Sequence, residues 1–330
     1  MDLYQVIIVI VVSLIVLFFI FGYIVNDIVL NKIYGRRGDG SISIKYSCPS
    51  HYPNLKVKKS YFLNNKKARL SIYEYIDKSI NEPKAVILLA HGIGGGHFYL
   101  LPLINHLCKN GYLVLAYDQY ASGTSEGLKL EAMTQGNIDV KYAVRYVNEN
   151  YPKMRFFVMG HSWGGYCAAQ ALRYSKRIEK CVDIAGLDSE AMMVRQMSKY
   201  GGFAYHLVRF CCFTHYGFHA YQTTYGIFKK THAKVLYLQG KEDASVLPRF
   251  SGLMYQKKLK NHKNIEIKML DKKGHAPFVD YDSQLKQAEV MKQFGILGGV
   301  LVDQKIYVDY VKTSIPDMEI YNLIVNYLDN

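Results

Sequence analysis

The feature that most constrains the fold is a short glycine-rich motif between an apolar run and a helical stretch. Residues 160–165 read Gly-His-Ser-Trp-Gly-Gly, with Phe-Phe-Val-Met before them and Cys-Ala-Ala-Gln-Ala-Leu shortly after. The G-x-S-x-G pattern in this setting predicts a strand that turns sharply into a helix, with Ser162 at the tip in a strained conformation. We expect glycine to be required at Gly160 and Gly164, because a side chain there would collide across the turn. A helix-capping serine is the alternative interpretation of Ser162.

The chain from residue 56 onward repeats this alternation of strand and helix. Strand-like apolar runs alternate with helical stretches and follow a predicted β-hairpin; they lie at 85–92, 112–118, 155–160, 180–186, 234–240 and 264–271. Such units predict an α/β fold with a mostly parallel central sheet and helices on both faces. Residues 187–233 are too long for an ordinary loop, so we expect an inserted, largely helical cap there. Residues 280–314 also interrupt the alternation, before a final helix at about 316–328.

An uncharged apolar run of 20 residues occupies positions 6–25. As a helix it would be about 30 Å long, which matches the hydrocarbon core of a bilayer. A cleavable signal would need a basic leading region and a small-residue cleavage site, and neither is present. We therefore expect residues 1–30 to form a transmembrane helix, 31–55 a basic juxtamembrane linker and 56–330 the folded domain.

Much of the net charge of +14 lies next to this run. Residues 26–69 contain ten Lys or Arg and two acids, a local charge of +8. This distribution indicates a single-pass membrane protein whose basic segment faces anionic lipid and whose domain is cytoplasmic, because the N-terminal side has no Lys or Arg. Alternatively, part of the charge is an ordinary solvated hairpin surface. No nucleic-acid recognition motif accompanies it, so we expect no nucleic-acid partner.

A serine nucleophile needs a base, and the base needs an orienting acid. His275 follows the predicted strand 264–271, and Asp243 follows the strand 234–240. Both lie at carboxyl ends of strands, where open α/β sheets collect their active sites, and the order Ser–Asp–His suits this motif. We predict a catalytic triad of Ser162, Asp243 and His275. Glu242 and Asp188 are the alternative acids.

The glycine-rich loop after the strand 85–92 is a candidate oxyanion site. Gly92 and Gly94 flank Ile93, whose backbone N–H we expect to act with that of Trp163 on a developing oxyanion. A phosphate-binding loop is excluded by spacing, because no Gly-Lys-Ser/Thr follows and position 97 is histidine.

Two features of the cap have competing interpretations. A cluster of Cys211, Cys212, His215 and His219 suggests a metal, but Gly217 weakens the helix that would align them and no acid is adjacent, so we expect no metal. The cap is also rich in aromatic residues, which fit either an apolar acyl pocket or simple packing on the sheet. These residues are Phe203, Tyr205, Phe210, Phe213, Tyr216, Phe218, Tyr221 and Tyr225. The six cysteines show no C-x-x-C pair and predict no disulfide scaffold.

Several motifs together resemble the α/β-hydrolase superfamily over residues 56–330, in particular its monoglyceride-lipase and serine-aminopeptidase-like branch and the membrane-anchored relatives of that branch. They are His91-Gly92-x-Gly94, Asp118 with Gly123-x-Ser125-x-Gly127, the turn at Ser162, Gly240-x-x-Asp243 and Gly274-His275. The resemblance implies an acyl-enzyme mechanism without a cofactor and a cap that selects the substrate. Tyr120-Ala121 departs from the family's usual Arg-Gly, and Trp163 stands where Met or Gln is frequent.

These features predict a membrane-anchored serine hydrolase that cleaves an ester-type acyl bond of a lipid or lipophilic substrate. In this hypothesis Ser162 attacks the carbonyl, His275 acts as base and then acid, and Asp243 orients the imidazole. The alternatives within the enzyme class are a peptidase, an acyltransferase and a thioesterase. A non-catalytic membrane-associated binding protein is the alternative outside it. A dehalogenase is disfavoured, because its nucleophile must be a carboxylate.

Overall fold

The structure is a computed structural model that describes residues 2–38, 44–197, 200–293 and 308–330. Parts of two predicted segments, the linker 31–55 and the segment 280–314, therefore lie outside the described residues.

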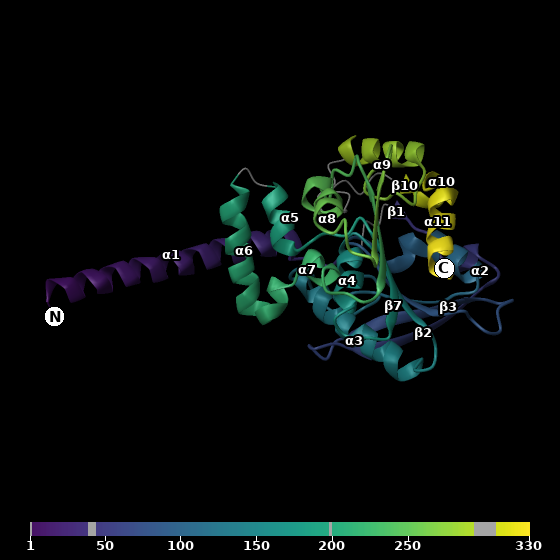
Figure 1. The fold of residues 1–330 in the computed structure, drawn as a ribbon, viewed down its shortest axis with the longest axis horizontal. Coiled ribbons are helices and arrows are strands. Elements are labelled where there is room, and N and C mark those ends of the chain that lie inside the picture. The colour runs from purple at the N-terminus through teal and green to yellow at the C-terminus, as the bar shows by residue number, and fades with distance from the viewer. Residues whose placement is uncertain (1, 39–43, 198–199, 294–307) are drawn as a thin grey trace.

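A single eight-stranded sheet forms the centre of the domain, with strand order β2-β3-β5-β4-β6-β7-β8-β9 (Figure 1). The hairpin β2–β3 and the pair β3–β5 are antiparallel, and every later pair is parallel, which confirms the predicted mostly parallel sheet. The strands are β2 Leu55–Leu63, β3 Arg69–Asp77, β4 Val86–Ala90, β5 Leu113–Tyr117, β6 Phe156–His161, β7 Ile178–Ile184, β8 Lys234–Gly240 and β9 Ile265–Leu270.

Helices cover both faces of the sheet, and each face has its own apolar core. Successive strand residues point to opposite faces, so Leu88 and Leu89 of β4 belong to different cores. Residues of α3, α4 and α8 pack in the first core, and residues of α2 and α11 pack in the second. Their bounds are α2 Leu101–Lys109, α3 Thr134–Asn150, α4 Trp163–Ala171, α8 Gly252–Lys258 and α11 Met318–Asp329. Burial on both faces explains why the parallel strands are continuous apolar runs.

The chain between β7 and β8 is helical, as expected for a cap. It contains α5 Glu190–Met197, α6 Gly201–Tyr216 and α7 Thr224–Phe228, with α6 packed against both α5 and the long N-terminal helix (Figure 1).

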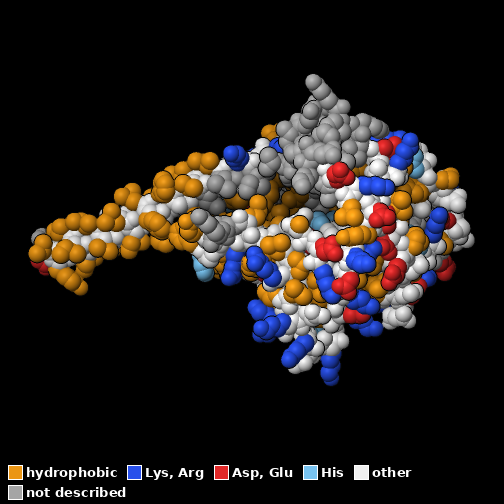
Figure 2. All heavy atoms as spheres, turned by 90° about the horizontal axis from the view of Figure 1, so that it is seen from above, with side chains coloured by type: hydrophobic (Ala, Val, Ile, Leu, Met, Phe, Trp, Pro, Cys, Tyr) orange, Lys and Arg blue, Asp and Glu red, His pale blue; other side chains and the backbone are white. Residues whose placement is uncertain are grey.

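The N-terminal helix α1, Leu3–Tyr34, protrudes from the domain, and hydrophobic side chains run along the protruding part (Figure 2). By length and composition, Leu3–Lys32 is able to cross a membrane, with a mean hydropathy of 3.2. A signal sequence can have the same length and apolar composition. The last turns of α1 are part of the domain, because Leu30 and Tyr34 are buried in the first core and Lys129 Nζ donates to Asn31 Oδ1 at 2.7 Å.

A small second sheet joins two segments that sequence reasoning treated separately. Strand β1, Ile44–Lys45, lies in the predicted linker and pairs in parallel with β10, Val308–Asp309. Helix α10, Tyr310–Thr313, follows β10, and α9, Tyr281–Gln293, precedes it in the chain. The linker is therefore attached to the segment that follows His275.

Part of the basic segment is engaged within the domain. Four of its cations form ion pairs with acids elsewhere in the chain: Lys45 with Asp309, Lys58 with Glu74, Lys66 with Glu131 and Arg69 with Glu126. The guanidinium of Arg37 also donates to the carbonyl oxygens of Gly123 and Gly127. These contacts reduce the charge that remains available for a membrane surface.

The packing of β4 generates a stability prediction. Leu89→Ala should lower the free energy of unfolding by about 3 kcal/mol, because it opens a cavity in a core where Leu89 is fully buried. Leu253→Ala, at an exposed position of α8, should change it by less than about 0.5 kcal/mol. Denaturant unfolding of both variants provides the measurement, and similar losses in the two would contradict this packing.

Candidate active site

Ser162 lies at the tip of the turn between β6 and α4, in a strained backbone conformation with φ 59° and ψ −119°. A Cβ atom at Gly160 would lie 2.0 Å from the carbonyl oxygen of Gly164, and one at Gly164 would lie 2.0 Å from that of Ala90. Because the obstructing atoms belong to the backbone, no side-chain rotation could relieve these clashes. The two glycines therefore permit the turn that exposes the Ser162 hydroxyl.

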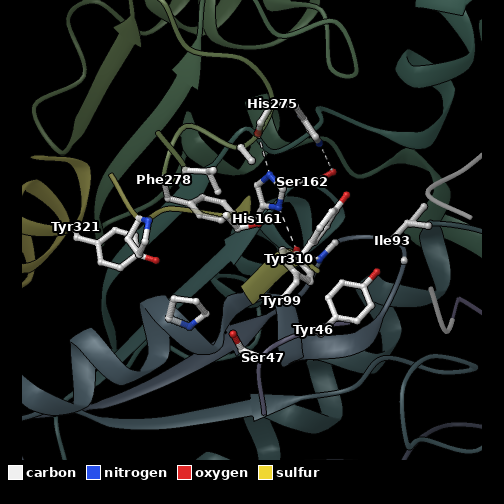
Figure 3. A pocket seen from close by; sticks show the side chains of 17 residues that line it. Tyr46, Ser47, Ile93, Tyr99, His161, Ser162, His275, Phe278, Tyr310 and Tyr321 are labelled. Atoms are coloured by element: carbon white, nitrogen blue, oxygen red, sulfur yellow. Dashed lines mark hydrogen bonds between the residues drawn. The ribbon is translucent and has the colours of Figure 1, made fainter. Parts of the chain in front are cut away.

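The side chains of Ser162, His275 and Asp243 form one hydrogen-bonded line. The Nε2 atom of His275 lies 2.9 Å from Ser162 Oγ (Figure 3). Its Nδ1 atom lies 3.0 Å from each carboxylate oxygen of Asp243. Asp243 follows β8 and His275 follows β9, so the carboxyl ends of three parallel strands bring the three side chains together. The structure thus places the predicted residues in the geometry of a nucleophile, a base and an orienting acid.

The surroundings of Asp243 favour its ionised form. Its carboxylate accepts hydrogen bonds from the backbone N–H groups of Ser245 and Val246, both at 2.9 Å, and from Gln239 Nε2 at 3.1 Å. Burial raises the pKa of Asp243, but the adjacent His275 and these hydrogen bonds outweigh burial, so the pKa lies below its ordinary value.

The alternative acids lie elsewhere. Glu242 accepts a hydrogen bond from Tyr281, and Asp188 accepts from Tyr255 and from the backbone of Tyr225 at the base of the cap. Of the three candidate acids, Asp243 is the one that contacts His275.

The loop after β4 carries the predicted oxyanion donors. Gly92, Ile93 and Gly94 line the same cavity as Ser162. In the described part of the chain, neither the backbone N–H of Ile93 nor that of Trp163 donates to a protein acceptor. Both groups therefore remain available for a substrate oxygen.

Two side chains that sequence reasoning missed connect this loop to the base. The Tyr99 hydroxyl accepts from the N–H of Gly92 at 2.7 Å and lies 3.0 Å from His161 Nδ1. The Nε2 atom of His161 lies 2.9 Å from the carbonyl oxygen of His275. Because a carbonyl only accepts, Nε2 carries the proton and Nδ1 accepts from Tyr99. Position 161 lies within the quoted motif, but no sequence signal pointed to Tyr99.

Asp118, one of the residues that carry the resemblance, holds a neighbouring loop. Its carboxylate accepts from the backbone N–H of His97 at 3.0 Å and from that of Thr124 at 2.9 Å. His97 Nδ1 also lies 2.8 Å from the carboxylate. Asp118 therefore fixes the chain just beyond the oxyanion loop.

The pocket at Ser162 has walls from unexpected segments. Its free volume is about 190 Å³, and Tyr46 and Tyr310 line it together with Tyr99 and Phe278 (Figure 3). Tyr46 follows β1 and Tyr310 follows β10, so the small second sheet supports this wall. Among the described residues, none from 187–233 lines the pocket, so of the two interpretations of the cap's aromatic residues the acyl pocket is not supported by this cavity.

The polar cluster of the cap is dispersed. His215 lies beside Tyr23 of α1, His219 beside Tyr174, and Cys212 beside Glu190. Within the described ranges, no group of three or more metal-type ligands occurs.

Known proteins are similar to part of this chain. Residues 81–209 match the family model of serine aminopeptidase, S33. The chain is 33% identical over 129 residues to a proline iminopeptidase of Thermoplasma volcanium, covering 39% of this chain and 43% of that protein. It is 32% identical over 91 residues to the monoglyceride lipase of Rattus norvegicus, covering 27% and 30% respectively. The chain thus matches less than half the length of either relative.

Solved structures extend the likeness to most of the domain. A Pyrococcus furiosus esterase has a TM-score of 0.57 at 20% identity, covering 77% of this chain and 98% of that one. With its eight-stranded, mostly parallel sheet and the serine turn after β6, the chain has the fold of the α/β-hydrolase superfamily. Within that superfamily its similarity is to the serine aminopeptidase family and to monoglyceride lipases, as the sequence motifs implied.

Buried His161 generates a pH prediction. Burial and the neighbouring His275 lower the pKa of His161 to about 3. Below a pH of about 6.5 the unfolded chain binds a proton at this residue and the folded chain does not, so stability falls as the pH falls. Between pH 7 and pH 5 the free energy of unfolding should decrease by about 2 kcal/mol more in the wild type than in His161→Asn.

Urea unfolding at the two pH values measures this difference. His232→Asn is a suitable control, because His232 is exposed and far from Ser162 in the sequence, and it should keep the wild-type dependence. Identical pH dependences in the wild type and His161→Asn would contradict the assignment.

Proposed function

We propose that this protein is a serine hydrolase that cleaves a neutral carboxylic ester through an acyl-enzyme on Ser162. The observation that carries the proposal is the hydrogen-bonded line from Ser162 through His275 to Asp243, which starts at a strained turn. The alternative interpretation of Ser162 as a helix-capping residue has less support. Its side chain forms no capping hydrogen bond with α4, and capping would not need a positive φ.

The geometry supports a complete acyl-transfer cycle. Ser162 Oγ attacks the carbonyl carbon as His275 Nε2 takes its proton, and the oxyanion accepts from the N–H groups of Ile93 and Trp163. The C–O bond to the leaving group breaks as His275 returns the proton to the departing oxygen. Water then attacks the acyl-enzyme with His275 again as base, which releases the carboxylic acid and regenerates Ser162.

The pocket supports an ester rather than an aminopeptidase substrate. The described lining residues include no Asp, Glu, Lys or Arg. An aminopeptidase must bind the protonated amino terminus of its substrate, and burying that ammonium without a carboxylate is costly. Apart from its two histidines, the pocket offers mainly aromatic and aliphatic side chains, which suit an uncharged acyl or alcohol group.

The same proposal includes membrane anchoring through α1 and a lipid or lipophilic ester as substrate. The apolar run of α1 supports it, as does the position of Lys32, Arg36 and Arg37 on the domain side, which favours a cytoplasmic domain. A substrate that partitions into the bilayer would be concentrated near an anchored enzyme.

The central test is labelling by a fluorophosphonate and hydrolysis of esters in detergent. The wild type should be labelled and should hydrolyse uncharged aryl esters, whereas Ser162→Ala should lose labelling and at least about a thousandfold in kcat/KM. Ser175→Ala is the control, because Ser175 is half-buried and follows the carboxyl end of α4, whereas Ser162 precedes its amino end. Amino-acid arylamides are assayed in parallel. If the wild type hydrolyses them faster than aryl esters, the proposed function would be an aminopeptidase and not an esterase. Absence of labelling in the wild type would support a binding protein.

The contacts of Tyr99 predict a smaller and more specific effect. Tyr99→Phe removes the hydroxyl that bonds Gly92 N–H and His161 Nδ1. The oxyanion loop then loses its link to His161, the residue that bonds the His275 carbonyl. We expect kcat for an aryl ester to fall about tenfold with little change in KM, since about 1.4 kcal/mol of transition-state stabilisation is lost. Tyr142→Phe on α3 should leave kcat unchanged. A Tyr99→Phe variant with wild-type kcat would contradict this positioning role.

A further inference from the structure

Helix α6 of the cap has exposed aromatic rings on the side that faces away from the domain, beside the exposed polar residues His206 and Thr214. Val208, Cys211 and Cys212 face inward and are buried, but Phe203 and Phe210 remain 59% and 36% exposed on the outer side. A helix that covers a soluble domain normally has a polar outer face. Since the pocket at Ser162 includes no described cap residue, these rings do not serve as its walls.

The exposed side of α6 is next to the apolar part of α1. The Phe18 and Phe203 rings lie 6.1 Å apart, and the Phe19 and Phe210 rings lie 5.5 Å apart. At the crossing, a Cβ atom on Gly22 would lie 2.9 Å from a methyl carbon of Leu207. Figure 1 shows α6 running across α1 rather than along it. The contact is therefore local, and the outer face of α6 is uncovered on both sides of the crossing.

The position of this crossing along α1 fixes the depth of α6 in a bilayer. Phe18 and Gly22 lie seven and three residues before Val25, the end of the apolar run, which corresponds to roughly 5–10 Å along the helix axis. Helices that lie flat in a membrane interface bury their apolar face to the same depth, about 5–10 Å. If α1 spans the membrane, α6 is placed at the boundary between headgroups and acyl chains.

The charge of the cap suits the same surface. Residues 191–233 of the cap contain five Lys or Arg and no Asp or Glu. The two acids of the cap, Asp188 and Glu190, are buried. Near an anionic leaflet each such cation is attracted, and no acid within this stretch opposes the attraction. The combination of basic and aromatic residues is typical of segments that lie on membranes.

We propose that α6 lies in the plane of the membrane beside α1, with Phe203 and Phe210 among the acyl chains. This inference rests on the membrane anchoring in the proposed function and adds a second contact with the same leaflet. It assigns the cap aromatic residues to a lipid surface rather than to an acyl pocket. Two helices, α1 and α6, would then fix the orientation of the domain relative to the membrane.

Tryptophan fluorescence in lipid vesicles provides a direct test. The one native tryptophan, Trp163, is 1% exposed and should be silent to lipid-borne quenchers. In full-length protein reconstituted into phosphatidylcholine and phosphatidylglycerol vesicles, Phe210→Trp should be quenched by lipids brominated on the acyl chain near the headgroup. Met318→Trp is the matched control, because Met318 is 49% exposed on α11, at the opposite end of the domain from α1 (Figure 1).

A third variant separates this inference from the anchor. Ile15→Trp should be quenched by bromines near the chain end. Quenching there without quenching of Phe210→Trp would overturn the in-plane helix and leave the anchor intact, whereas no quenching of either would overturn both. The proposed esterase activity is tested independently of both results, because fluorophosphonate labelling is measured on the same samples.

A second arm addresses another possible occupant of the α6 face. The double variant Phe203→Ser/Phe210→Ser should hydrolyse a soluble aryl ester at the wild-type rate and an ester embedded in vesicles about tenfold more slowly. Self-association of the wild type that this variant abolishes, without any lipid quenching of Phe210→Trp, would assign the face to a second copy of the chain and overturn the proposal.

Discussion

The close approach of β6 and α4 at Ser162 is the constraint on which the rest of the site depends. The Gly160 Cα and the Gly164 carbonyl are so near that no Cβ fits between them, and Ser162 turns the chain between them with a positive φ. Only then does the hydroxyl project beyond the sheet edge, where the loops after β8 and β9 can reach it. Burial of β6 between two apolar cores holds the strained turn in place.

Most of the fold was predictable, because local patterns determine it. Strands buried on both faces are apolar runs, and glycine-rich turns mark their carboxyl ends, so the sheet, the hairpin and the helices could be located from residue types alone. The positions of Ser162, Asp243 and His275 followed from the same logic, since parallel strands bring their carboxyl ends to one edge. The structure places these three within hydrogen-bonding distance, and their catalytic roles remain a proposal.

What could not be predicted depends on contacts between segments far apart in the chain. Tyr99 is one of many tyrosines, and only the folded structure shows that its hydroxyl lies between Gly92 and His161. The role of the cap's aromatic residues stayed open for a related reason: an aromatic-rich segment fits a pocket, a core or a lipid surface equally well until its neighbours are known. Here its exposed rings lie against α1, whereas the pocket wall comes from Tyr46 and Tyr310.

The pairing of β1 with β10 has a practical consequence for biochemists who want a form of this protein without its apolar N-terminal helix. A fragment cut just before the large sheet, at residue 55, would remove Tyr46 along with α1 and leave β10 without its neighbour. Such a truncated protein could retain an intact Ser162 turn and still show altered substrate selectivity. A soluble fragment that keeps the native cavity must start upstream of Ile44.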